Sequence, residues 1–495
     1  MPDAERQVQP LPAILSKSRL IAVRQCRRRL WLEVNRPDLQ NYGTGTLQRF
    51  AQGRQLNALI RRLYPDGVLI DEKLALQDAI AFTNAHLARS PQSPLFEASF
   101  SEGRVSVRAD IIRKTQDGFE LTEVKSSTRL KPHHLADCAV QNWVISQAGY
   151  PVQRTLLAHI DTRFEYLGNG DYSGLLKHVD VTDRIADLVP AVPGWIDEGL
   201  ETLSLAKEPD VATGPHCTRP FACPFIAHCS PPATQYPVGL LPGGGRIINE
   251  LLAEGIEDIR DIPDGRLHKP LQRRVRTATL SGKPYMAPEL GNALRSLPCP
   301  RYYLDFEAIQ FAIPRWAGTR PYQQLPFQWS CHIESAAGQL QHADFLDTRG
   351  EAPMRACAVT LVDALGSDGP IFTYSRYERT VIHQLAARFP DLAERLHGLA
   401  ERLFDLLPLI KAHYYHPAMK GSYSLKAVLP TVAPELSYDG LGDVQDGTGA
   451  QLAYEKLIDA DTPSEQRRKL SDQLREYCQL DTLAMVRIVW FFENC

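Results

Sequence analysis

Three kinds of feature are absent from this sequence of 495 residues. No apolar run approaches the roughly 20 residues that cross a bilayer, which excludes a transmembrane protein and predicts that the membrane is not a partner. The first residues are polar and lack the basic and then apolar pattern of a secretory signal, so the cytoplasm is the expected compartment. The sequence also contains no internal repeat and no low-complexity tract. What remains is the composition of an ordinary globular protein.

An excess of charge of one sign is also lacking, since 55 Lys and Arg face 58 Asp and Glu and leave a net charge of −3. The field of the whole molecule therefore does not attract nucleic acid, and any such binding must be local. Two basic clusters qualify, residues 24–29 and residues 273–276. Taken alone, each cluster is better explained as a solvated helix face. The ten cysteines are expected to be ligands or core residues rather than disulfides.

The length favours two or three domains, and prolines and glycines between residues 230 and 245 mark one boundary. An amphipathic helix is predicted from Arg246 to Glu254, ending at Gly255. With the spaced isoleucines that follow, this segment resembles a helix-hairpin-helix, a module that binds nucleic-acid backbones; a linker of short helices is the simpler alternative. We therefore expect domains over residues 1–232 and 298–495, with a helical linker over residues 233–297 between them.

The first candidate site lies on a predicted β-hairpin. Residues 104–113 alternate as in a half-buried strand, with Asp110 opposite the apolar face. That apolar face consists of Val105, Val107, Ala109 and Ile111. After a turn at residues 116–118, the return strand over residues 119–125 directs Glu123 and Lys125 to one face. The hairpin then brings two carboxylates and an ammonium group together.

Such a set suits phosphodiester hydrolysis, because Mg²⁺ or Mn²⁺ prefers carboxylate oxygens and lowers the pKa of a bound water. Lysine orients that water or offsets the charge that develops on the phosphate. Glu97, which precedes the hairpin, is a further candidate ligand. The alternative is an exposed hairpin with a cross-strand ion pair, which stabilises a fold little.

Asp110, followed after twelve residues by Glu123-Val-Lys125, resembles the PD-(D/E)xK motif of RecB-like nucleases. The resemblance implies a restriction-endonuclease-like α/β core, and Asp110, Glu123 and Lys125 are expected to form the principal hydrolytic site of the protein. It also implies a glutamine and a tyrosine on the following helix, for which Gln141 and Tyr150 are the candidates, although their separation exceeds the family's usual one. Nucleases of this family thread an end of the strand past the metal, so the resemblance implies single-stranded or end-exposed DNA as the partner, favoured over RNA. It also implies a role in genome defence or DNA repair.

Five residues separate each neighbouring pair in Cys217, Cys223 and Cys229, within a loop-like stretch. Three thiolates need a fourth to hold a [4Fe–4S] cluster or Zn²⁺, and ligand type does not choose between these; three buried or free cysteines are the alternative. RecB-like exonucleases of the CRISPR-associated and helicase–nuclease kinds carry one cysteine before the core and three after it. That resemblance favours iron–sulfur and implies Cys26 as the fourth ligand. Six cysteines are assigned to cores and surfaces: Cys138, Cys299, Cys331, Cys357, Cys478 and Cys495.

The second candidate site lies in the carboxy-terminal part. A predicted strand from Arg301 buries Leu304 and Phe306 and presents Asp305 and Glu307 together. On a predicted helix, Tyr477 and Asp481 share a face at i and i+4. Either pair alone is ordinary. The stretch from Lys420 to Lys426 is either a phosphate-binding loop or, more simply, a capped helix start.

Together these pairs resemble the DEDD exonucleases of the RNase H-like fold, in the subgroup with a tyrosine four residues before the last aspartate. The resemblance implies a mixed-sheet domain and a two-metal site that cleaves 3′ to 5′. For the middle carboxylate it implies Glu378, with Asp405 as the competitor. The whole chain resembles bacterial fusions of a RecB-like and an RNase H-like nuclease. The alternatives are an RNA exonuclease that acts through the second site, or a scaffold that binds nucleic acid without cleaving it.

Overall fold

The computed structural model describes residues 14–89, 93–230, 234–442 and 444–494. Cys495 and the segment at the expected domain boundary, residues 231–233, lie outside the described residues. The chain divides into two compact units, each with helices and a mixed sheet. Unit 1 comprises residues 1–231 and 311–322, and unit 2 comprises residues 232–310 and 323–495. The segment predicted as a linker, residues 233–297, therefore belongs to unit 2, and a short insertion from the second half belongs to unit 1.

Unit 1 is built on a seven-stranded sheet with the order β2-β3-β4-β5-β6-β7, in which β1 also pairs with β4. Its strands are β1 Leu15–Ser16, β2 Val68–Leu69, β3 Leu95–Glu102, β4 Val105–Lys114, β5 Phe119–Lys125, β6 Val152–Ile160 and β7 Leu176–Asp180. The antiparallel pairing of β4 with β5 confirms the predicted hairpin. Strand β6 is parallel to β5, because α5 makes the crossover between them.

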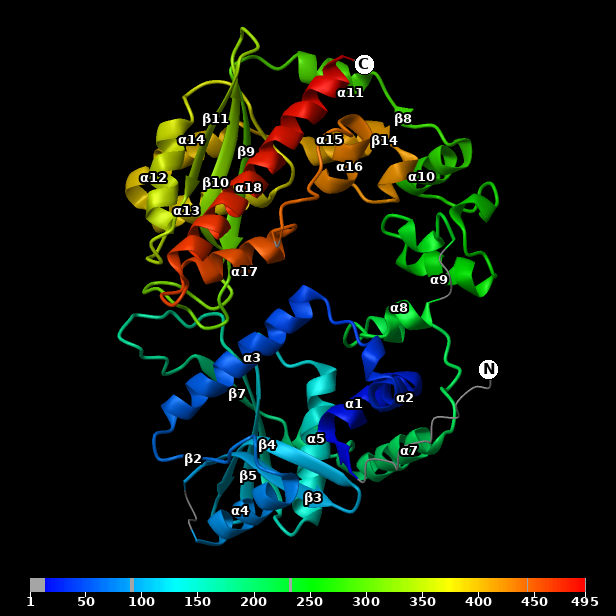
Figure 1. Cartoon of the computed structure of the whole chain (residues 1–495), viewed down its shortest axis with the longest axis vertical. Coiled ribbons are helices and arrows are strands. Elements are labelled where there is room, and N and C mark those ends of the chain that lie inside the picture. Colours follow the sequence, from blue (N-terminus) through cyan, green and yellow to red (C-terminus); the bar gives the residue numbers. More distant parts are fainter. Residues whose placement is uncertain (1–13, 90–92, 231–233, 443, 495) are drawn as a thin grey trace. The chain divides into compact units, whose positions relative to one another are not determined.

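Helices cover both faces of this sheet (Figure 1). They are α1 Lys17–Gln25, α2 Arg27–Asn35, α3 Thr44–Leu63, α4 Leu76–Arg89, α5 Pro132–Gln147, α6 Thr182–Ile185, α7 Val192–Ser204 and α8 Ile226–Cys229. Apolar residues of α1, α5 and α7 pack in one cluster with β3, β4 and β5. Leu56, Leu59 and Ile60 of α3 pack against the opposite face. The sheet is thus buried on both sides, which places its acidic residues in a largely dry interior.

The prediction that Val105, Val107, Ala109 and Ile111 share one apolar face of β4 is wrong for Ile111. Val105, Val107 and Ala109 pack with α5 as expected, but Ile111 packs on the α3 side and Ile112 takes the place expected for it. The alternation changes at Asp110. Its cross-strand neighbour Glu97 has a φ of 55°, a left-handed conformation that is unfavourable for a residue with a side chain. The regular pairing of β3 with β4 is thus interrupted at Glu97 and Asp110, which a strict alternation along each strand does not predict. The interruption changes the faces to which the side chains at and after these positions point.

Unit 2 contains a five-stranded sheet with the order β11-β10-β9-β12-β13 and a two-stranded sheet, β14-β8. The strands are β8 Tyr285–Met286, β9 Arg301–Ile309, β10 Leu325–Glu334, β11 Leu340–Leu346, β12 Ile371–Thr373, β13 Leu403–Asp405 and β14 Tyr414–Tyr415. Strands β9, β10 and β11 are antiparallel neighbours, whereas β12 and β13 run parallel to β9. The strand predicted at Arg301 is therefore the centre of the sheet.

The helices of unit 2 are α9 Gly245–Ala253, α10 Pro270–Ser281, α11 Glu289–Arg295, α12 Met354–Ala364, α13 Tyr377–Arg388, α14 Ala393–Glu401, α15 Leu406–His413, α16 Leu425–Val432, α17 Gly447–Leu457 and α18 Ser464–Glu493. The long α18 packs along β9 and β10 (Figure 1). Helix α9 matches the predicted amphipathic helix to within one residue, and Gly255 has the positive φ of 78° expected after a helix end. These contacts place α18 beside the carboxylates of β9.

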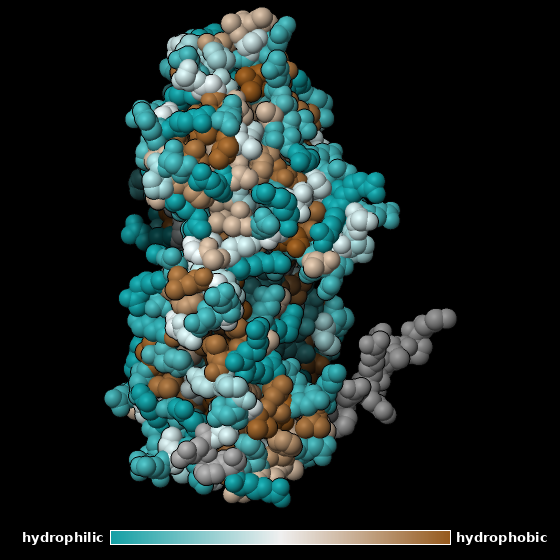
Figure 2. Space-filling model, turned by 90° about the vertical axis from the view of Figure 1, so that its left-hand side faces the viewer, coloured by the Kyte–Doolittle hydropathy of each residue, from teal (hydrophilic) through white to brown (hydrophobic). Residues whose placement is uncertain are grey.

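Thirteen large hydrophobic side chains are exposed among the described residues. On the face in Figure 2 they are interspersed with hydrophilic residues. Within the described ranges, no helix combines the length and the apolar character that crossing a membrane requires.

Candidate metal-binding sites

The acidic site of unit 2 is formed where β9 and α18 meet. Asp305 and Glu307 are two residues apart on β9 and share one face, and Asp481 reaches them from α18. One oxygen from each of these three carboxylates lies within 4.8 Å of the other two. Within the part of the chain that the structure describes, no other group of three His, Cys, Asp or Glu residues meets this criterion. The two predicted pairs are therefore brought together.

These carboxylates line a cavity of about 810 Å³. Glu378, in the first turn of α13, lines the same cavity and is 3% exposed. Its competitor Asp405 instead caps α15, where its side chain accepts a hydrogen bond from the backbone N–H of Leu407 at 3.0 Å. The fourth carboxylate of the cavity is thus Glu378, the residue that the resemblance implies.

Burial and mutual repulsion raise the pKa values of these carboxyl groups. Burial, and then repulsion by Asp481, raises the pKa of Glu307 to about 8. Burial also raises the pKa of Glu378 to about 7 and that of Asp481 to about 6. The pKa of Asp305 lies well above its ordinary value because of burial and the neighbouring carboxylates. A site that disfavours its own ionisation to this degree is stabilised by a bound cation.

One lysine and two tyrosines complete the wall of this site. Tyr438 donates a hydrogen bond to Asp481 Oδ1 at 2.6 Å. Lys426 Nζ lies 3.1 Å from the Tyr477 hydroxyl and is 4.8 Å and 4.7 Å from the ring centres of Tyr438 and Tyr477. Lys426 lies in the first turn of α16, whose N-cap position is Ser424, so the predicted helix start is present, but the Ser424 side chain makes no capping hydrogen bond. Sequence reasoning did not identify Tyr438.

Cys478, one of the six cysteines expected in cores or on surfaces, also lies at this site. It is fully buried, as expected, but its Sγ lies 3.7 Å from Asp305 Oδ2. Of the other cysteines given that assignment, Cys138, Cys331 and Cys357 are buried and Cys299 is exposed. Adjacency of Cys478 to Tyr477 on α18 was the only signal available in the sequence.

The acidic site of unit 1 is centred on Glu123, which is 1% exposed. Its Oε1 lies 2.7 Å from Lys125 Nζ and 2.8 Å from Lys17 Nζ. Its Oε2 accepts a hydrogen bond from Gln141 Nε2 at 2.6 Å. Burial alone would raise the pKa of Glu123, but the two ammonium groups hold it well below its ordinary value. Both carboxylate oxygens therefore already have protein partners.

Asp110 lies beside this group. Its Oδ2 accepts a hydrogen bond from the backbone N–H of Val124 at 2.7 Å, and it lines a small cavity with Glu97 and Arg61. Burial, and then the charge of Glu123, raises the pKa of Asp110 to about 8. Burial also raises the pKa of Glu97. The structure thus gathers Glu97, Asp110, Glu123 and Lys125 in one region. Of the three carboxylates, Glu123 is the one whose two oxygens both have side-chain partners.

Two members of this site were missed from the sequence, and one candidate lies elsewhere. Lys17, at the start of α1, and Asp137, on α5, both join the ion-pair network, with Asp137 Oδ2 2.5 Å from Lys125 Nζ. Tyr150 was expected on the same helix as Gln141 but follows the end of α5. Its hydroxyl donates to Asn84, and its ring packs against Phe100. Gln141 is therefore the helix residue that reaches Glu123.

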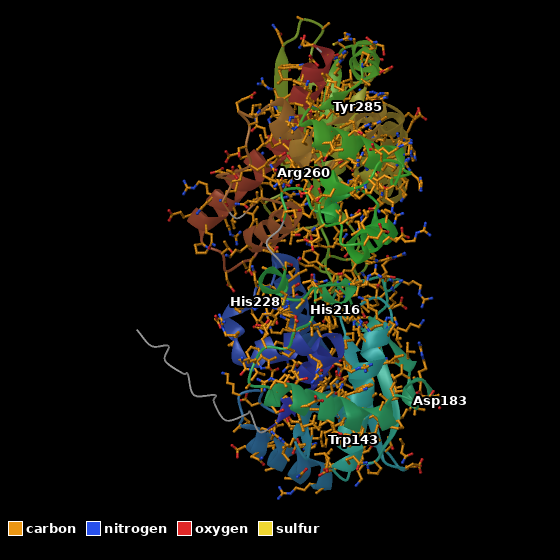
Figure 3. The ribbon with its side chains drawn as sticks, turned by 90° about the vertical axis from the view of Figure 1, so that its right-hand side faces the viewer. Trp143, Asp183, His216, His228, Arg260 and Tyr285 are labelled. Atoms are coloured by element: carbon orange, nitrogen blue, oxygen red, sulfur yellow. The ribbon has the colours of Figure 1, made fainter. Side chains whose placement is uncertain are left out.

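The four predicted cysteine ligands, Cys26, Cys217, Cys223 and Cys229, line one small cavity of unit 1. Cys26 lies between α1 and α2, and the other three come from the segment that also carries His216 and His228 (Figure 3). Burial raises the pKa of Cys223 and raises that of Cys229 to about 11. Among the described residues no three of these Sγ atoms lie within 4.8 Å of one another, so the cysteines share a cavity without the close approach seen in unit 2. Thiols are nevertheless the soft donors that iron–sulfur clusters and Zn²⁺ use.

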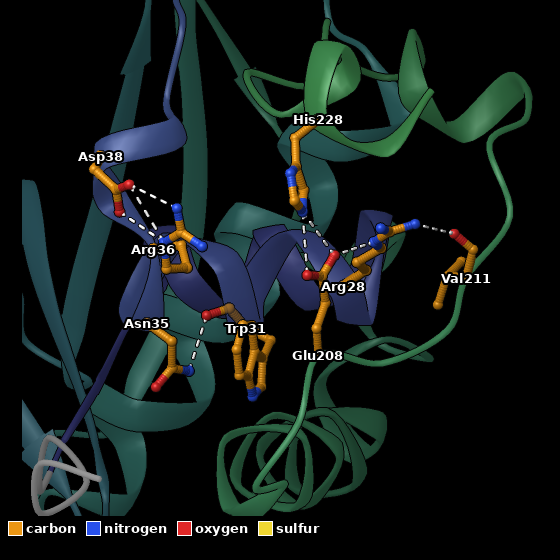
Figure 4. A network of polar contacts seen from close by, with 8 residues as sticks. All are labelled: Arg28, Trp31, Asn35, Arg36, Asp38, Glu208, Val211 and His228. Carbon is orange, nitrogen blue, oxygen red and sulfur yellow. Dashed lines mark hydrogen bonds and ion pairs between the residues drawn. The ribbon is translucent and has the colours of Figure 1, made fainter. Parts of the chain in front are cut away.

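Helix α2 is tied to this segment by a polar network (Figure 4). Arg28 donates to Glu208 and to the carbonyl oxygen of Val211, and His228 Nε2 lies 3.1 Å from Glu208 Oε2. Arg36 and Asp38 form a separate ion pair at the end of α2. The arginines at 27–29 are thus half-buried and paired with glutamates within unit 1, rather than forming the solvated helix face that was expected.

Comparisons with known proteins give little beyond this geometry. A family model described as "Domain of unknown function (DUF2779)" matches residues 302–424, which include three of the four cavity carboxylates and exclude Asp481. No curated protein matches the chain. A solved structure titled "Crystal structure of SSO0001" is similar at 14% identity over 46% of this chain and 91% of that chain, with a TM-score of 0.23. A likeness of this size does not bear on fold or function.

Proposed function

We propose that this protein is a divalent-metal-dependent nuclease whose principal site is the acidic cavity of unit 2. The observation that carries the proposal is the approach of Asp305, Glu307 and Asp481 to within 4.8 Å of one another inside a large cavity. Three clustered carboxylates suit Mg²⁺ or Mn²⁺, which prefer oxygen ligands. When bound, such an ion polarises a phosphate and lowers the pKa of a coordinated water.

The residues that line the cavity or contact its carboxylates have roles that follow from their contacts. Tyr438 orients Asp481 through its hydrogen bond, and Lys426 holds the Tyr477 hydroxyl at the edge of the carboxylates. Lys426 also places one positive charge beside them, which stabilises their ionised form. Lys269 and Lys411 line the same cavity, where they would attract a polyanionic substrate.

Nucleic acid is the proposed substrate because the DEDD arrangement is the one that these residues resemble. The mixed sheet centred on β9 and the helix that carries Tyr477 and Asp481 are consistent with an RNase H-like domain. That resemblance also supports 3′-to-5′ cleavage, with DNA favoured and RNA as the alternative substrate.

For unit 1 we propose a second, RecB-like nuclease site on a restriction-endonuclease-like core. Asp110, Glu123, Lys125 and Gln141 support it, because the structure gathers them at the hairpin. The two lysines on Glu123 make this site different from the first, since a metal ion would have to compete with them for the carboxylate.

The cysteine cavity is proposed as the site of a [4Fe–4S] cluster, with Zn²⁺ as the alternative. Its donor chemistry fits either centre. A centre held by Cys26 together with Cys217, Cys223 and Cys229 would connect the two ends of unit 1, so its binding would contribute to folding.

The test is cleavage of end-labelled single-stranded DNA and RNA with Mg²⁺, with Mn²⁺ and with chelator. We expect metal-dependent release of nucleotides that is lost in Asp481→Asn, which keeps the size of the side chain and removes its charge. Asp472→Asn on the same helix is the matched control, because Asp472 is exposed. Inactivity of the parent on every substrate, with salt-dependent binding retained, would instead support a binding scaffold.

A further inference from the structure

We propose that a basic groove beside α10 binds the backbone and one base of a single-stranded nucleic acid and guides the strand into the acidic cavity of unit 2. The inference rests on the proposed function and adds the location of the binding surface. The groove has a volume of about 380 Å³. It is lined by Pro270, Arg273, Arg274, Thr277, Ala278, Ser281, Lys283, Pro284 and Tyr285. These described lining residues include three cations and no acid.

The two basic clusters of the chain differ in how their positive charges are compensated. Arg27, Arg28 and Arg29 are each paired with a glutamate, at Glu201, Glu208 and Glu33. In the second cluster, Arg276 is the one arginine with an acidic partner among the described residues, Asp264 at 2.6 Å.

Arg273 and Lys283 are exposed, and neither takes part in an ion pair among the residues that the structure describes. An uncompensated positive groove on a chain of net charge −3 is a local site for a polyanion. The second cluster is therefore more than a solvated helix face.

An aromatic ring stands beside these cations. Tyr285, on β8, is 40% exposed (Figure 3). The guanidinium group of Arg274 lies 4.2 Å from the centre of its ring. Pairing of β8 with β14, where Tyr285 is opposite Tyr415, fixes the backbone of this residue. An exposed, well-anchored aromatic ring next to cations is the combination on which unpaired bases stack.

The groove adjoins the acidic cavity. Lys269, which lines the cavity, immediately precedes Pro270, which lines the groove. Arg274 of the groove donates to the carbonyl oxygen of Lys411, another cavity residue. Cations therefore continue from the exposed groove to the carboxylates within the same unit.

A single strand fits these features better than a duplex. Stacking on Tyr285 requires a base that is free of a partner, and the bases of a duplex are stacked on each other. Because backbone charge and a stacked base occur in both DNA and RNA, the shared chemistry is that of single-stranded nucleic acid, and the experiment compares the two sources.

The experiment measures binding without cleavage, by fluorescence anisotropy of a labelled 20-nucleotide strand of DNA or RNA in chelator. We expect Arg273→Gln/Lys283→Gln to weaken binding at least tenfold. The slope of log affinity against log salt should fall by about 1.4, since each lost phosphate contact contributes about 0.7 for a single strand. Tyr285→Ala should weaken binding about tenfold with an unchanged salt slope, and Tyr285→Phe should restore it, because stacking is not electrostatic.

Arg468→Gln/Lys469→Gln is the matched control, because it removes two exposed cations from α18 in the same unit. If this control loses as much affinity as the groove variant, binding is diffuse and the groove proposal is wrong. Parental affinity in the Arg273→Gln/Lys283→Gln and Tyr285→Ala proteins would overturn it as well. Binding in chelator does not depend on catalysis, so failure of the nuclease proposal would appear separately, as absent cleavage by a parent protein that binds.

Discussion

The acidic sites of the two units contain similar residues and differ in what neutralises them. In unit 1, two ammonium groups contact one oxygen of Glu123, and Gln141 donates to the other. In unit 2, four carboxylates share one cavity, and of the three lysines that line it Lys426 is the one that lowers the pKa of Glu307 and Asp481. The pKa of Glu123 is therefore lowered, whereas that of Glu307 is raised to about 8.

This difference shows that the number of acidic residues in a motif does not by itself indicate how strongly the site would bind a metal ion. A buried carboxylate that already has cationic partners gains less from a metal ion than one that faces other carboxylates. On this basis the site of unit 2 is the better candidate for metal-dependent chemistry, although the motif of unit 1 is the more specific of the two in the sequence. The predictions below test this ranking.

The largest expected effect is on cleavage. Asp305→Ala should reduce metal-dependent cleavage of single-stranded DNA by at least about 100-fold, because it removes a proposed ligand and transition-state charge stabilisation. Lys125→Ala should have a smaller effect on the same substrate. Parallel assays of both variants on end-labelled DNA and RNA measure the difference. A larger loss in Lys125→Ala would reverse the ranking and make unit 1 the principal site.

The next effect concerns the cation of unit 2. Lys426 lowers the pKa of Glu307 and of Asp481, so Lys426→Met should raise both. The acidic limb of the pH–rate profile should then move by about one unit to higher pH, with about a tenfold loss of rate below the new pKa. Lys426→Arg should retain much of the parental profile. A uniform loss of rate at all pH values would show that Lys426 acts only on folding or substrate binding.

A third effect is on thermal stability. Glu307 has a pKa of about 8 in the folded protein, whereas an unfolded carboxyl group has a pKa near 4. Between these two pH values the folded cavity therefore binds more protons than the unfolded chain does. The free energy of unfolding in chelator should fall as pH rises through this window. Saturating Mg²⁺ or Mn²⁺ should raise Tm by about 5 °C at pH 8 and by less at pH 5.5. Differential scanning calorimetry measures both.

The same measurement assigns the metal effect to one unit. Asp305→Asn should abolish the metal-induced rise in Tm, because it removes a proposed ligand. Glu123→Gln should retain the rise. Loss of the rise in Glu123→Gln would place the stabilising ion in unit 1 and contradict the ranking of the two sites.

The smallest effect on cleavage is expected from the cysteine cavity. Cys223→Ser should remove bound iron or zinc and lower the Tm of unit 1, while cleavage at unit 2 stays within about twofold, since the two sites belong to different compact units and share no residue. Metal analysis and visible absorbance after anaerobic purification measure the first result. Cys299→Ser, at an exposed cysteine, is the control. Brown colour indicates iron–sulfur, and a colourless protein with one zinc per chain indicates the alternative.

Much of the local structure could be predicted from the sequence. The hairpin at Asp110 and Glu123, the strand from Arg301 and the helix that ends before Gly255 all follow from periodicity and turn residues, and the structure contains them. The irregularity at Asp110 and Glu97 could not be predicted, because it depends on a conformation shared by two paired strands. Lys17 and Asp137 were missed for a related reason, since neither belongs to the motif whose residues they contact.

The sequence by itself determined which acidic side chains share one face of a strand or helix, because period and residue type decide this. It also determined that charge had to act locally, since the totals nearly cancel. Only the tertiary structure decided how each charge is compensated: Arg28 meets Glu208 and Arg273 meets no acid among the described residues, although both stand in similar basic runs. Ionisation and metal affinity depend on neighbours within a few ångströms, and those neighbours come from elements far apart in the chain.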